Sequence, residues 1–435
     1  MRKALAKALI ELVNEQVLSP EKADEIRAYY QAKNERAPNR LMIVFGILGA
    51  LLVGLGVILI FAHNWDDLSR STKTILAFVP LLMGQLACGY SLWKQRENIS
   101  WREGSSTFLI FAIGANISLI SQIYHISGSM SGFILTWALL SLPLVYVLRS
   151  SMSSIFYLIG ISWYAWEIGY WHHSSQIPFL YPLLLLLVLP HYYLLYKKSA
   201  SSNFTSFYHW LVALSLITVL GTVATDHEEW IFVAYMSLFG ILFIIGSTRY
   251  FKEYRSLNNG PAILGSTGTI LLLIFMSFHG IWRELADNRA AILPESLFAP
   301  EFIIAALLSF GAITLFFILH RRQPVWEPAP LSWISILFIP IFFTGLSNPL
   351  TATVLINVLL LLLGLYHIRQ GTQKHHLGRL NFGLLIISTL IICRFFDTNI
   401  SFVLRGFLFV ALGVSFFAAN YIMLKKKSSS AKKLS

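Results

Sequence analysis

Long apolar stretches, separated by short polar segments, follow one another along almost the whole chain after residue 40. Each stretch is about 20 residues long, which is the length that an α-helix needs to cross the hydrocarbon core of a bilayer. The pattern therefore predicts an all-α fold, a polytopic transmembrane helix bundle of about fourteen spans. The predicted spans are residues 41–62, 74–93, 105–124, 131–148, 152–171, 177–196, 206–225, 229–247, 260–280, 301–320, 330–347, 350–368, 379–397 and 402–424.

The N-terminal segment, residues 1–40, has a different pattern. Leu5, Leu9 and Leu12 recur at helical spacing and form an amphipathic stripe, while Ser19 is followed by a proline, as at the start of a second helix. We expect a short helical hairpin that forms a cytoplasmic cap on the membrane domain. The alternative is that this segment binds a cytoplasmic partner.

Composition and charge support a membrane protein. Hydrophobic residues make up 56% of the 435 residues and charged residues only 12%, whereas a soluble domain carries about 25% charged residues. The net charge of +12 does not indicate a nucleic-acid partner, because the basic residues are spread over short loops and the termini.

The same basic residues predict the orientation of the chain. With fourteen spans, 27 of the 33 Lys and Arg residues fall on the side of the membrane that holds both termini. Positive loops face the cytoplasm, so both ends are predicted to be cytoplasmic. Residues 41–424 then form the transmembrane bundle, and residues 425–435 form a basic, flexible cytoplasmic tail.

The stretch "FAIGANISLISQIYHISG" is apolar but carries several hydrogen-bonding side chains. On a helix, Ser118, Gln122 and His125 share one face with a glycine, and Asn116 lies nearby. An unpaired polar group in hydrocarbon is costly, so this face is expected to meet other helices or a wet cavity. Two interpretations stay open, namely hydrogen bonding between helices and the lining of a solute or headgroup site.

Charged residues within or beside the spans are further candidates for a ligand-binding site. Asp66 follows the first span, Glu167 lies in the fifth, Arg394 and Asp397 end the thirteenth, and Arg405 lies in the fourteenth. The predicted topology places all of them on the outer side, where charges at membrane depth are candidates for function. Arg394 and Asp397 can pair on one helical face, with Arg405 nearby.

Arginine side chains at this position point to an anion. The planar guanidinium suits phosphate and carboxylate groups, so an acidic solute or a lipid headgroup is the expected ligand. A closed ion-pair network that only fixes the last two spans is the alternative. The two cysteines lie in apolar runs, and the histidines lack the spacing of a metal site, so we expect no metal and no cofactor.

Several motifs resemble a known family. The segments "LSPEKADEI", "GILGALLVGLGVILIFAHNWDDLS", "IFAIGANISLISQIYHISG" and "WALLSLPLVYVLRSS" closely resemble the bacterial membrane-protein family called domain of unknown function 2157, over about residues 5–150. The C-terminal segment containing "RFFDTNISFVLRG" is similar to the end of longer members. The resemblance implies a polytopic protein of the bacterial inner membrane and implies no activity. Residues 150–380 carry no recognised motif.

These observations lead to a functional hypothesis. We expect a transporter-like or lipid-handling protein that is not an enzyme, with a polar cavity open to the outer side. Its expected partners are membrane lipids and an anionic small solute or lipid headgroup. One alternative is a membrane-embedded transferase that acts on a lipid-linked substrate. The other is a non-catalytic scaffold or sensor read out through residues 1–40.

Overall fold

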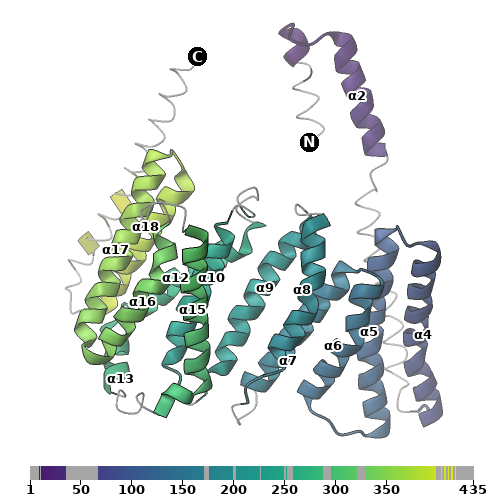
Figure 1. Cartoon of the computed structure of the whole chain (residues 1–435). Coiled ribbons are helices and arrows are strands. Elements are labelled where there is room, and N and C mark those ends of the chain that lie inside the picture. Colours follow the sequence, from purple (N-terminus) through teal and green to yellow (C-terminus); the bar gives the residue numbers. More distant parts are fainter. Residues whose placement is uncertain are drawn as a thin grey trace. The chain divides into compact units, whose positions relative to one another are not determined.

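The computed structural model divides the chain into two compact units, Met1–Leu76 and Ala77–Ser435. Every regular element among the described residues is a helix, which confirms the predicted all-α class (Figure 1). The described residues are 9, 11–35, 67–170, 176–198, 202–225, 227–248, 251, 258–287, 295–320, 329–397, 403, 406, 407, 410, 413, 414 and 417.

In the first unit, a helical segment is followed by a turn and then by α2 (Pro20–Glu35). The turn contains Gln16 in the left-handed region at φ 60°. Ser19 begins α2 as its sequence predicts, because its Oγ accepts a hydrogen bond from the Lys22 N–H at 3.4 Å. Local chemistry therefore accounts for both the bend and the start of this helix.

In the second unit, each predicted span between residues 74 and 397 corresponds to a helix or to a pair of helices. The helix that begins this series, α4, has its first seven residues in the first unit. The elements are α4 (Arg70–Lys94), α5 (Ile99–Tyr124), α6 (Met130–Val147), α7 (Ser151–Tyr170), α8 (Tyr181–Lys198), α9 (Asn203–Leu220), η1 (Gly221–Val223), α10 (Trp230–Gly246), α12 (Gly260–Phe275), α13 (His279–Asp287), η3 (Glu295–Phe298), α15 (Pro300–His320), α16 (Pro330–Ser347), α17 (Pro349–Gln373) and α18 (Leu377–Asp397).

Eight of the described helices are long and apolar enough to cross a membrane, or nine if α12 and α13 count as one bent span. The protein is thus a multi-pass helical membrane protein, as predicted. The expected spans 41–62 and 402–424 and the tail 425–435 lie outside the described residues, apart from isolated positions in the last span. The total of fourteen spans stays a prediction.

The sequence was expected to form one continuous span over 260–280, and this expectation is wrong. Helix α12 ends at Phe275, and α13 continues from His279 at an angle of 75°. The second piece is amphipathic and buries Trp282 and Leu285. Anchoring of these two side chains turns the chain away from the axis of α12.

The helices of the second unit share two main hydrophobic cores. One lies in α6 to α9 and includes the fully buried Tyr157 and Tyr208. The other extends from α9 to α18 and contains Trp230, Trp282 and Phe342. Helix α10 is at the centre of the second core, because it packs against α12, α15 and α16 (Figure 1). Helix α9 packs against α7 as well as α10 and thereby joins the two cores.

Candidate functional site

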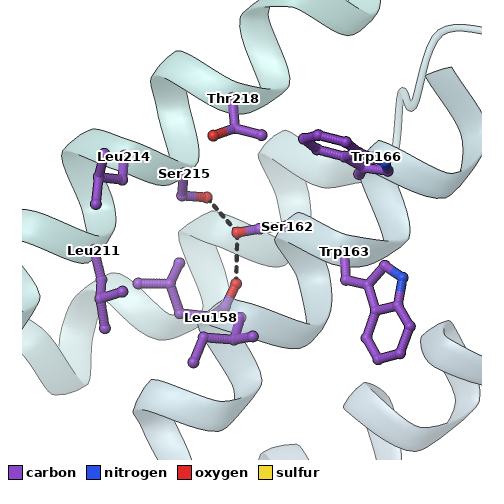
Figure 2. Close-up of a pocket in the computed structure, with 9 residues that line it drawn as sticks. Leu158, Ser162, Trp163, Trp166, Leu211, Leu214, Ser215 and Thr218 are labelled. Atoms are coloured by element: carbon purple, nitrogen blue, oxygen red, sulfur yellow. Dashed lines mark hydrogen bonds between the residues drawn. The ribbon is translucent and has the colours of Figure 1, made fainter. Parts of the chain in front are cut away.

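A groove of about 370 Å³ lies between α7 and α9. Its walls are mostly aliphatic and aromatic, with only three hydroxyl side chains, a composition typical of small-molecule sites. Figure 2 shows leucines of α9 on one side and tryptophans of α7 on the other, across a pair of serines. The lining residues are Leu158, Ile159, Ser162, Trp163, Trp166, Leu211, Leu214, Ser215 and Thr218.

The serines belong to a directed chain of hydrogen bonds. Ser162 Oγ donates to the Leu158 carbonyl at 2.7 Å and lies 2.6 Å from Ser215 Oγ. Ser215 Oγ in turn lies 2.6 Å from the Tyr181 hydroxyl. Each hydroxyl has one proton, so Ser215 must donate to Ser162, and Tyr181 must donate to Ser215. Ser162 keeps a lone pair but has no proton to spare, so it offers the groove an acceptor.

The shape of the groove follows from the register of α7 and α9. The pairs Ser162–Ser215 and Gly169–Thr222 are both separated by 53 residues, so the two helices run parallel. A Cβ on Gly169 would lie only 2.2 Å from the Thr222 Cβ, so the helices touch at that end. Trp163 and Trp166 line the open side and are 42% and 43% exposed. The groove is therefore closed at one end and open sideways.

A second polar site lies at the break between α12 and α13. The Met276 carbonyl accepts a hydrogen bond from Trp282 Nε1 at 2.6 Å, and the Ser277 carbonyl accepts one from Asn357 Nδ2 at 3.0 Å. These bonds satisfy carbonyls that the interrupted helix leaves without an intrahelical partner. Side chains of α13 and α17 thus stabilise the break.

Arg394 of α18 lies at the same break. Its Nη2 donates to Ser277 Oγ at 3.1 Å, and its guanidinium carbon is 5.0 Å from the centre of the Phe278 ring. The side chain of Asp397 and all of Arg405 lie outside the described residues. The structure therefore places one predicted site residue on the broken helix, while the proposed group of two arginines and an aspartate stays a prediction.

The predicted polar face of α5 is only partly present. Asn116 Nδ2 donates to the Ala77 carbonyl of α4 at 3.0 Å, which is a hydrogen bond between helices. Ser118 and Gln122 are exposed. His125 does not continue the helical face, because it ends α5 in the left-handed conformation, with φ 52°. The expectation that His125 shares the helical register of Ser118 and Gln122 is wrong.

Those predicted site residues that the structure describes do not gather in one place. Helix α5 packs against α6 and α7, whereas α18 packs against α17 and α12. Glu167 is partly buried on α7, next to the groove residue Trp166, and Asp66 lies outside the described residues. Among the described residues, no group of three His, Cys, Asp or Glu side chains is placed to hold a metal ion.

Sequence reasoning missed the groove itself. Ser162 and Ser215 are isolated hydroxyls in apolar helices, and neither stands out alone. The available signal was the equal spacing of small or hydroxyl residues in two spans, Ser162 and Gly169 in one and Ser215 and Thr222 in the other. This signal acquires meaning only when the two helices are known to be neighbours.

The comparisons with known proteins bear on the N-terminal part of the chain. A search of curated proteins and a search of solved structures gave no match. Residues 11–154, which include α2 and α4 to α6, match the family model described as "Predicted membrane protein (DUF2157)", and this match confirms the resemblance predicted from the motifs of that segment.

Proposed function

We propose that the protein handles a lipid-like substrate, and that the groove between α7 and α9 binds its hydrocarbon chain. The observation that carries this proposal is a groove with apolar walls that opens sideways between two helices. Helix α9 is one of the helices long and apolar enough to cross a membrane, which supports a groove that opens toward hydrocarbon. Its volume of about 370 Å³ lies within the range of about 300–1,000 Å³ that ligand sites show.

The floor of the groove narrows the substrate class. Ser162 and Ser215 have committed their protons, so a ligand group that bonds to these two serine oxygens must bring the hydrogen-bond donor. A neutral lipid with a hydroxyl or an amide meets this requirement, whereas a phosphate diester, which has only acceptors, does not. The sequence led us to expect a polar cavity on the outer side. The proposed binding site is instead an apolar groove in which serine oxygens can accept a hydrogen bond from the ligand.

Photocrosslinking tests this function. Purified protein is irradiated with diacylglycerol that carries a diazirine in one acyl chain, and the labelled peptides are identified by mass spectrometry. We expect labelling to concentrate in α7 and α9, and Leu214→Trp to reduce it about fivefold or more by filling the groove. Leu337→Trp on α16 is the matched control, because Leu337 is 46% exposed and Leu214 is 41% exposed. Equal labelling of all helices, or no difference between the two variants, would overturn the proposal.

A second function, transport of a small anionic solute, is favoured by the break between α12 and α13. Discontinuous transmembrane helices commonly form the binding sites of transporters, and here the break meets the guanidinium of Arg394. Binding of an anion to the folded state raises the melting temperature. We expect inorganic phosphate or a dicarboxylate to raise it in the parent protein, and Arg394→Lys to abolish that rise while leaving the melting temperature without anion nearly unchanged. Retention of the rise in Arg394→Lys argues against an anion site.

A further inference from the structure

A carboxylate from α5 binds the start of α7. The predicted topology places this end of α7 on the cytoplasmic side of the membrane. Glu103 accepts hydrogen bonds from Ser150 Oγ at 2.6 Å, from the Ser151 N–H at 3.0 Å and from the Met152 N–H at 2.9 Å. The two N–H groups are among the backbone donors that the first turn of a helix leaves unpaired, so Glu103 acts as a cap of α7.

Just beyond this cap, four buried polar atoms have no hydrogen-bond partner among the described residues. They are Ser153 Oγ, Ser154 Oγ, His191 Nε2 and Tyr208 Oη. Three of these residues are 0% exposed, and His191 is 7% exposed. The four come from α7, α8 and α9, three helices that pack on one another. They are therefore part of a shared core rather than isolated surface groups.

The contacts between the helices bring these atoms together. The ring centres of His191 and Tyr208 are 6.4 Å apart. In the register of α7 and α9, a residue of α7 lies level with the residue 53 positions later, as Ser162 does with Ser215. Ser154 is therefore level with the helical turn of α9 that contains Tyr208. Tyr157, one turn along α7, donates to the Leu184 carbonyl of the antiparallel α8, so the serines and His191 lie on the same side of this contact, toward the start of α7.

Leaving one buried polar group unpaired costs more than a typical hydrogen bond gains, and folded proteins contain few such groups. Four on three neighbouring helices therefore need a partner other than a described side chain. Proteins satisfy groups of this kind with internal water, which needs a polar site with two to four hydrogen-bonding partners. The four atoms supply acceptors and donors in the required number.

We propose that an internal water cluster occupies the space among Ser153, Ser154, His191 and Tyr208. Glu103 interacts electrostatically with both His191 and Tyr208, so its charge reaches the same space. Waters there join the cap of α7 to α8 and α9 through bridging hydrogen bonds. This hydrated site lies about one helical turn from Leu158 and Leu211, where the apolar groove begins. It is distinct from the groove and does not depend on the lipid function proposed above.

Radiolytic footprinting in water enriched in oxygen-18 detects bound internal water, because hydroxyl radicals formed from such water attack the side chains that touch it. We expect Tyr208 to be oxidised about fivefold or more faster than Tyr157. The comparison is matched, because the two tyrosines belong to one core and are 0% and 1% exposed, but the Tyr157 hydroxyl bonds directly to a carbonyl. Equal, low oxidation of both would overturn the proposal.

A pair of conservative variants gives an independent readout. If the site were dry, Tyr208→Phe would remove an unpaired group and leave the melting temperature unchanged or raise it. If water binds there, Tyr208→Phe removes a bonded group and lowers the melting temperature, as Tyr157→Phe does. We expect both variants to melt lower than the parent protein. A melting temperature of Tyr208→Phe at or above that of the parent protein would overturn the water cluster.

Discussion

The helices α5 to α9 and the helices α10 to α18 are built by different means. In the first group, hydroxyl side chains meet across helices, as in the chain from Tyr181 to Ser162, and a groove remains between α7 and α9. In the second group, aromatic rings fill the interior, and glycines allow close approach. A Cβ on Gly345 would lie 2.1 Å from the Trp282 ring, and one on Gly240 would lie 2.4 Å from Ser335 Oγ.

The difference shows where ligands are expected. Lipid provides no hydrophobic drive between helices, so packing and hydrogen bonds hold a membrane bundle together. The second group relies mainly on packing, and its broken helix has partners for the Met276 and Ser277 carbonyls. The first group leaves a groove that another molecule can use. We therefore expect the first group to bind the lipid-like ligand and the second to be the more rigid of the two.

The prediction with the largest expected effect tests whether the second group is packed more tightly than the first. Trp282→Ala removes a fully buried ring and its bond to the Met276 carbonyl, so we expect a loss of about 3–5 kcal/mol in the free energy of unfolding. Trp166→Ala, in the open groove, should cost only about 0.5 kcal/mol while reducing the diacylglycerol labelling. Chemical denaturation in detergent micelles measures both. Similar losses for the two variants would contradict a tight second group and a loose first group.

The second prediction concerns the cap of α7. Glu103→Gln keeps the size of the side chain but removes the charge that accepts from Ser150, Ser151 and Met152. We expect a loss of about 1 kcal/mol, the usual value of a helix cap. Glu97→Gln, at an exposed position just before α5, is the control and should be silent. A silent Glu103→Gln would mean that the cap does not stabilise the first group.

The third prediction compares the two serines in the floor of the groove. Ser215→Ala leaves the buried Tyr181 hydroxyl without its acceptor, so we expect a loss of about 1 kcal/mol. In the double variant with Tyr181→Phe, the tyrosine hydroxyl that lacks an acceptor is also removed. The double variant should therefore regain most of the lost stability, because the two substitutions are coupled. Ser162→Ala should cost less, since Ser215 can turn toward its own helix. Additive losses in the double variant would show that the directed chain of hydroxyls is absent.

The smallest expected effect separates the two interpretations of the polar face of α5. Asn116→Leu removes a hydrogen bond to α4, and such bonds between membrane helices are worth about 0.6 kcal/mol. Gln122→Leu, at an exposed position, should leave the unfolding free energy unchanged. A Gln122→Leu variant that is stable but loses the binding of an anionic probe would instead favour the lining of a ligand site.

The position of the spans was predictable, whereas the sites were not. Bilayer thickness imposes a length of about 20 residues on each apolar run, and this single constraint locates helices such as α15 and α16 within a residue or two. The break after Phe275 was missed, because the apolar run continues through Met276 and the turn depends on partners as distant as Asn357. The predicted span 105–124 ends where α5 ends, but His125 was wrongly placed on its helical face, because a left-handed histidine has no clear sequence signal.

The groove was missed for a more general reason. It depends on the relative register of α7 and α9, which comes from Ser162 meeting Ser215 and Gly169 meeting Thr222. No periodicity within either helix contains this information. The sequence pattern did identify Arg394 as unusual, yet its partner Ser277 is 117 residues away and could not be named in advance.

The chain separations of these contacts also set an order of assembly during synthesis. The bonds to Glu103 join residues only 47 to 49 positions apart, which a ribosome making about 5–20 residues per second covers in about 2–10 s. The bond from Arg394 to Ser277 spans 117 positions, so it needs about 6–23 s at the same rate. The helices that carry the groove and the cap can therefore come together in the membrane while the partners of the broken helix are still being translated.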